Sequence, residues 1–130
     1  MSKITKINSD GILAPCHAYR FYVDYSNSET EAFPTLKMQT LSVKYSLVDK
    51  VIDVLFELDV HGKCESELTN FISGGSRTMY INRLTGGSET NHVVKVKLQC
   101  ITECTVENDY AGMETLKASL KAKVVSFTIE

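Results

Sequence analysis

The stretch Leu41–Val60, LSVKYSLVDKVIDVLFELDV, contains two runs in which apolar and polar residues alternate, separated by the pair Asp49-Lys50. Alternation with a period of two places every second side chain on the same face of a β-strand, so each run is typical of a strand with one buried face. The apolar positions are Leu41, Val43, Tyr45 and Leu47 in the first run, and Ile52, Val54, Phe56 and Leu58 in the second.

The two runs predict an antiparallel hairpin with strands at Leu41–Val48 and Val51–Val60. A slip of one residue would place every apolar side chain opposite a polar one, so the pattern favours a register in which apolar faces apolar. With a two-residue turn at Asp49-Lys50, the predicted pairs are Tyr45 with Val54 and Val43 with Phe56. Tight turns of this kind favour Asn-Gly or Asp-Gly, so the turn geometry stays open.

The opposite face of the hairpin is polar and mostly acidic, and we expect it to meet solvent or a partner. No histidine falls on this face, so its acidic residues do not resemble the paired carboxylates of a catalytic site. This face carries Ser42, Lys44, Ser46, Asp53, Glu57 and Asp59.

The remaining chain predicts a mainly β (α+β) domain, an antiparallel sandwich or partial barrel with long strands and one short helix. Apolar residues at helical spacing predict the helix over Cys64–Ser73, with Gly74-Gly75 as its end. The apolar residues change from even to odd positions at Val124-Val125, which predicts a β-bulge or a strand that changes what it packs against. Met113, Leu116 and Leu120 also fit one face of a helix. Further strands are expected at Tyr19–Tyr25, around Thr78–Ile81, at His92–Cys100 and at Ala118–Ile129.

Length and composition predict one domain over residues 1–130, with residues 1–17 as an N-terminal arm or edge strand. The 130 residues are 43% hydrophobic and carry a net charge of -2, which gives no global basic field for nucleic acid. No signal peptide and no apolar run near the roughly 20 residues of a membrane span is visible. We therefore expect a cytoplasmic chain whose four cysteines are free thiols.

No motif indicates a metal, a cofactor or catalysis. On a regular strand, Cys100 and Cys104 would share a face about 13 Å apart, too far for one zinc ion with bonds of about 2.3 Å to sulfur. Cys16-His17 makes a poor second ligand pair, because adjacent strand residues point to opposite faces. The glycine-rich segments at 74–76 and 86–88 lack the lysine of a phosphate-binding loop. The basic stripe Lys117, Lys121 and Lys123 is interpreted as solubilising or subunit-facing.

The order of elements resembles the tail-tube proteins of contractile-tailed phages and related injection machines. An aromatic first strand, a long hairpin, a short helix, a glycine-rich loop and two closing strands follow one another over Ala18–Glu130. The closing strands are the most similar, at Val96–Ile101 (VKLQCI) and Val124–Glu130 (VVSFTIE).

This resemblance implies a structural subunit and no enzyme. Hexameric rings would form, with each copy adding four strands to a continuous inner barrel, and the rings would stack into a tube for DNA. Sheath and baseplate proteins are the expected partners, with no membrane contact. The expected location is the virion tail, assembled in the host cytoplasm. The polar hairpin face would line the channel and repel phosphate, or it would face the sheath or the next ring.

Two alternatives stay open. One is a baseplate or terminator subunit of the same fold. The other is a small intracellular ligand-binding β-barrel, which needs about ten short strands around an apolar cavity.

Overall fold

The computed structural model describes residues 17–27, 32–84 and 90–129, with the backbone alone for 90–93. The predictions for the arm before His17, for Cys16, for the side chain of His92 and for the glycine-rich segment at 86–88 lie outside these ranges. The described elements are β1 (Phe21–Ser26), α1 (Pro34–Gln39), β2 (Thr40–Ser46), β3 (Val51–Glu57), α2 (Lys63–Ser73), β4 (Thr78–Leu84), β5 (Thr90–Val106) and β6 (Lys117–Ile129).

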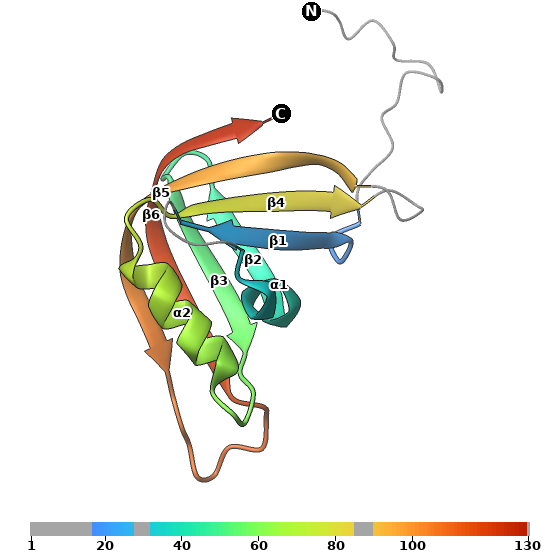
Figure 1. Ribbon diagram of the computed structural model, residues 1–130. Coiled ribbons are helices and arrows are strands. Elements are labelled where there is room, and N and C mark those ends of the chain that lie inside the picture. Colours follow the sequence, from blue (N-terminus) through green and yellow to red (C-terminus); the bar gives the residue numbers. More distant parts are fainter. Residues whose placement is uncertain (1–16, 28–31, 85–89, 130) are drawn as a thin grey trace, which may run out of the picture.

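The strands form one antiparallel sheet in the order β1-β4-β5-β6-β3-β2. The sheet curls into a partial barrel, because β5 and β6 bend and carry β1 and β4 across the direction of β3 (Figure 1). The register skips Val125 on β6 and both Gln99 and Thr102 on β5, and such β-bulges bend a strand and increase its twist. The predicted mainly β partial barrel and the bulge at Val124-Val125 are confirmed. The helical alternative is wrong, because Leu120 lies in β6.

The register of the β2–β3 hairpin differs from the predicted one by two residues. Tyr45 lies opposite Ile52 and Val43 lies opposite Val54, so the predicted pairs of Tyr45 with Val54 and Val43 with Phe56 are wrong. A slip of two residues leaves every side chain on its original face, so alternation alone cannot detect it. The predicted faces therefore survive while the partners change.

The turn explains the shift, because it contains four residues, Leu47–Lys50. The N–H of Lys50 donates to the Ser46 carbonyl at 2.9 Å, and the N–H of Asp49 donates to the Ser46 hydroxyl at 3.0 Å. Lys50 adopts a left-handed φ of 55°. Leu47 consequently leaves the strand and is exposed. Leu41 is skipped by the pairing between β2 and β3 and is also exposed, so neither joins the buried face as predicted.

Helix α2 matches the prediction within one residue at its start. Cys64, Leu68 and Phe71 are buried along one side, and the helix ends at Gly74. Its first turn is capped by the Asp59 carboxylate, which accepts the N–H of Cys64 at 2.9 Å and that of Lys63 at 3.1 Å. These bonds satisfy donors that have no partner within a helix.

Helix α1 was not predicted. It has six residues, too few to show a helical repeat. The N–H groups of Thr35 and Leu36 donate to Oε1 of Glu67 on α2, at 2.9 and 3.1 Å. The start of α1 is therefore held by a side chain more than thirty residues away in the sequence.

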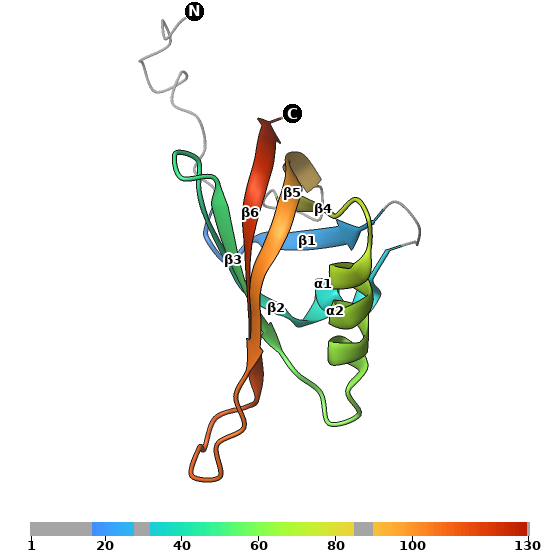
Figure 2. The same cartoon turned by 90° about the vertical axis from the view of Figure 1, so that its left-hand side faces the viewer.

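Both helices lie on the same side of the sheet, where they close the core (Figure 2). Aromatic rings meet there from four parts of the chain. The ring of Tyr25 on β1 lies 5.6 Å from Phe56 on β3 and 5.5 Å from Phe71 on α2, and Phe33 lies 5.7 Å from Phe71. No helix within residues 17–27, 32–84 and 90–129 covers the outer face of the sheet.

Candidate assembly surfaces

The outer face of β2 and β3 brings together most of the polar residues predicted for one face. Val43 and Tyr45 pack toward the core and Ile52, Val54 and Phe56 are buried, so the residues between them point outward. Lys44 lies opposite Asp53 in the observed register. The predicted residues on this face are Ser42, Lys44, Ser46, Asp53 and Glu57.

Strand β6 changes the charge of this face. It lies beside β3, so that Lys121 faces Asp53 and Lys117 faces Glu57. On the other side of β6, Glu103 lies opposite Lys121. Lysine and acid therefore alternate across the sheet, and the expectation of a mostly acidic surface holds only for β3 taken alone.

Asp59 does not lie on this face. It follows the end of β3, and its carboxylate is turned toward the start of α2. The hydrogen bonds from the N–H groups of Cys64 and Lys63 lower the pKa of Asp59 below its usual value. The alternating pattern predicted that Asp59 shares a face with Asp53 and Glu57, but β3 ends at Glu57.

The sheet has two edges within the described chain, because β1 and β2 each pair on one side only. Helix α1 packs beside β1, where Lys37 lies 3.5 Å from the carboxylate of Asp24 and 4.4 Å from the ring centre of Tyr22. On β2, Leu41 is 43% exposed and Lys44 is exposed. Strand β2 is thus the more open edge.

The loop between β5 and β6 projects from the body at one end of the sheet (Figures 1 and 2). It surrounds an open pocket of about 740 Å³ lined by Glu107–Tyr110 and Gly112–Leu116. Tyr110 is fully exposed and Met113 is 97% exposed. No role was predicted for this loop from the sequence. Its apolar residues stand out in a stretch that is otherwise polar and contains a glycine, and they could have indicated an exposed contact surface.

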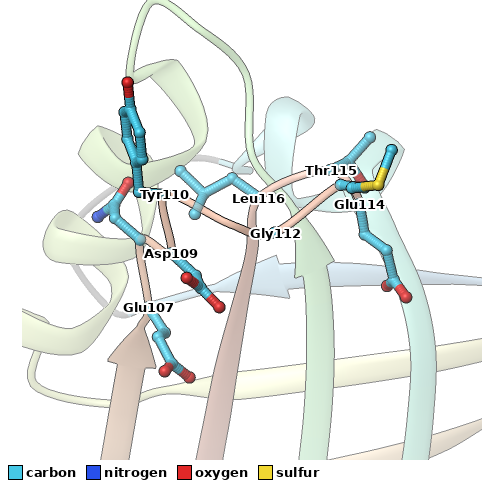
Figure 3. Close-up of a pocket in the computed structure, with 9 residues that line it drawn as sticks. Glu107, Asp109, Tyr110, Gly112, Glu114, Thr115 and Leu116 are labelled. Atoms are coloured by element: carbon cyan, nitrogen blue, oxygen red, sulfur yellow. The ribbon is translucent and has the colours of Figure 1, made fainter.

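The acids of this loop do not converge on one point. Figure 3 shows Glu107 and Asp109 on one side of the loop and Glu114 on the other. Across the described parts of the chain, histidine, cysteine and carboxylate side chains form no group of three that suits a metal ion.

A second cavity of about 290 Å³ lies between β1, β2 and β4. Among the described residues, its walls combine apolar and aromatic groups with two guanidinium groups. One of these, Arg83, donates to the hydroxyl of Tyr45 at 3.2 Å, which joins β4 to β2 across the opening of the curled sheet. The lining residues are His17, Ala18, Arg20, Phe21, Val43, Tyr45, Ile81 and Arg83.

Cys100 and Cys104 do not share a face, contrary to the prediction for a regular strand. Cys100 pairs with Lys123, which is exposed, while Cys104 pairs with Leu120, which is buried. The bulge at Thr102 lies between them and reverses the alternation. The bulge at Gln99 turns Cys100 to the outer face, where it lies opposite Lys123. Cys64, Cys100 and Cys104 are free thiols.

No protein-family model matches the chain, and no curated protein sequence matches it. Among the described residues, no helix has the length and apolar character needed to cross a membrane.

Proposed function

We propose that this chain is a structural subunit that assembles with copies of itself into stacked rings, as do the tail-tube proteins that it resembles. The observation that supports this most is the curled antiparallel sheet, which stays open with β1 and β2 at its edges in the described chain. Unpaired strand edges offer N–H and C=O groups to another chain. A ring in which β2 of one copy meets the next copy would satisfy them.

In this proposal the four strands β2, β3, β6 and β5 supply the wall of the channel. Their outer face carries Ser42, Lys44, Ser46, Asp53 and Glu57, whereas Asp59 is omitted because it caps α2. Lys44, Lys117 and Lys121 each face an acid, whereas the exposed Lys97 and Lys123 lie opposite Ser126 and Val51. Because part of the positive charge is paired, we expect DNA to pass along this wall without specific binding.

The proposal places the chain in the tail of a virion, assembled in the host cytoplasm, with rings of six copies. Sheath and baseplate proteins would be its partners, and a baseplate or terminator subunit would use the same sheet edges. The strand count argues against a ligand-binding barrel, since that alternative needs about ten short strands around an apolar cavity and the described sheet has six.

Light scattering and negative-stain imaging of the purified chain test the proposal, with rings or tubes as the expected result. Leu41→Lys places a charge on the open edge of β2 and should leave a folded monomer. Val60→Lys is the matched control, because Val60 is 95% exposed and lies outside the strands. A chain that stays monomeric at high concentration, or rings that form equally well with Leu41→Lys, would contradict edge-to-edge assembly.

A further inference from the structure

Strand β5 extends well beyond β4 and gives the sheet a further open edge. β5 has 17 residues and β4 has seven, and their pairing ends with Thr78 opposite Lys97. One more bond follows, from the N–H of Leu98 to the carbonyl of Arg77 at 3.0 Å. Over residues 99–106, β5 pairs with β6 on one side, and no described residue pairs with its other side. In Figure 1 this half of β5 runs down the left edge of the molecule, away from β4.

The proposed channel wall therefore ends in two open edges, β2 on one side and residues 99–106 of β5 on the other. The strands between them alternate in direction, because β2 with β3, β3 with β6 and β6 with β5 are all antiparallel pairs. β2 and β5 thus run in opposite directions. Rotation about the channel axis leaves the direction of each strand along that axis unchanged. Around a ring, β2 of one copy consequently meets β5 of the next copy as an antiparallel pair.

Charge favours the same pairing. On β5, Glu103 lies opposite Lys121 of β6, and Asp53 of β3 lies between Lys121 and Lys44 of β2. This row alternates in sign and ends with an acid at one open edge and a lysine at the other. An acid and a lysine directly opposite each other on adjacent strands attract. The alternation therefore continues unbroken when the two edges meet.

The composition of the two edges selects one register. Lys44 is the only charged residue of β2, and Glu103 is the only charged residue between 99 and 106. Any register that does not place them opposite each other loses the charge pair. With Lys44 opposite Glu103, Val43 lies opposite Cys104 on the inner face. Val43 is half-buried and Cys104 is exposed in the single chain, so the pairing would cover both.

We propose that β2 of one copy pairs antiparallel with residues 99–106 of β5 in the next copy, with Lys44 opposite Glu103 on the outer face. The four-stranded wall then continues from copy to copy with no unpaired edge between them. This inference rests on the self-assembly proposed above, and it adds the partner of the β2 edge and the register of the contact.

A disulfide across the contact tests this register in the full chain. Val43→Cys places a thiol opposite the native Cys104 of the next copy, and residues directly opposite in an antiparallel pair lie about 4.5–5.5 Å apart, within reach of a disulfide. Within one chain the two positions are three strand spacings apart, roughly 14 Å, which is too far to bond. Oxidised glutathione should therefore join position 43 of one chain to Cys104 of another, as peptide mass spectrometry identifies. Wild type and Val43→Cys with Cys104→Ser are the controls and should lack this crosslink.

Charge reversal tests the contact through association, measured by light scattering. Lys44→Glu and Glu103→Lys should each weaken association by about 2- to 30-fold per contact, because an opposite-charge pair becomes a like-charge pair. Combining them in one chain restores an opposite-charge pair between copies, so most of the association should return. Their effects on urea unfolding should instead add, because the two positions lie too far apart within one chain to interact. Asp49→Lys, in the exposed β2–β3 turn, is the control and should leave association unchanged.

The outcomes separate this contact from ring formation. Rings that carry the crosslink to Cys104 support both proposals. Rings without that crosslink, or a double charge reversal that associates no better than the single ones, overturn the pairing of β2 with β5 and leave ring formation standing. Crosslinked chains that form no rings support the pairing alone. A chain that stays monomeric and gives no crosslink overturns both.

Discussion

Asp53 on β3 lies directly opposite Lys121 on β6, at the centre of a row that continues to Lys44 on β2 and to Glu103 on β5. The row crosses four strands with alternating charge. The charges of this row balance one another, whereas Lys97 and Lys123 lie on the same outer face with no acid opposite them.

Reversing one charge in this row should destabilise the fold modestly. Asp53→Lys places three lysines side by side, and like charges on neighbouring strands cost roughly 0.2–1 kcal/mol per pair. Adding Lys44→Asp should recover about half of the loss, because it restores an opposite-charge pair on one side of position 53. Urea unfolding at low and high salt measures it, and the effect should shrink in salt. Asp49→Lys, in the exposed β2–β3 turn, is the control. Additive effects of the two substitutions would contradict the pairing.

Phe56→Ala should be among the most destabilising single substitutions. The Phe56 side chain is fully buried and lies against Tyr25, so its removal leaves a cavity that costs about 3–5 kcal/mol. The free energy of unfolding from urea titration is the measurement. Val48→Ala, at a position 90% exposed, should change it by no more than about 0.5 kcal/mol. A loss for Phe56→Ala as small as that for Val48→Ala would rule out its place in the core.

Asp59→Ala should reveal the cap of α2 through its pH dependence. The folded-state pKa of Asp59 is lowered, chiefly by the N–H of Cys64, so its carboxylate adds stability above the unfolded pKa of about 3.9. That stability is lost as the pH falls through the folded value. The difference in urea midpoint between wild type and variant should therefore be largest near pH 7 and shrink toward about pH 3. Asp49→Ala should show no such trend, and a pH-independent difference would contradict an ionic cap.

The cysteines should react with iodoacetamide at very different rates. Burial, with the charges of Asp59 and Glu67, raises the pKa of Cys64 to about 11, and only the thiolate attacks. Cys104 is exposed. We expect Cys104 to be alkylated in the folded protein and Cys64 only in urea, a difference of at least roughly 100-fold in rate. Peptide mass spectrometry identifies the sites. Equal labelling of both in the native state would contradict the burial of Cys64 under α2.

Local signals were strong enough to predict several elements from the sequence. Helix α2 combines a helical repeat with a glycine stop, and both act within a dozen residues. The bulge at Val125 could be predicted because the apolar residues change from even to odd positions within one strand, and this change does not depend on the neighbouring strand. Helix α1 left no such signal, since its first turn depends on Glu67 from another helix. The cavity between β1, β2 and β4 could not be predicted either, because its walls come from strands far apart in the chain.

Along the regular part of a strand, periodicity was enough to predict the buried face, because side chains alternate and burial of apolar surface selects one face. The prediction failed at the bulges, as for Leu41 on β2 and for Cys100 and Cys104 on β5. Tertiary structure alone decided which residues are neighbours across the sheet. The four-residue turn moved the partner of Tyr45 from Val54 to Ile52 without altering its face. Because β6 pairs with β3, the acids of β3 lie opposite lysines of β6, and the charges alternate between the two strands. Faces follow from periodicity within one segment, whereas pairing depends on turns, bulges and strand order, which involve residues far apart in the chain.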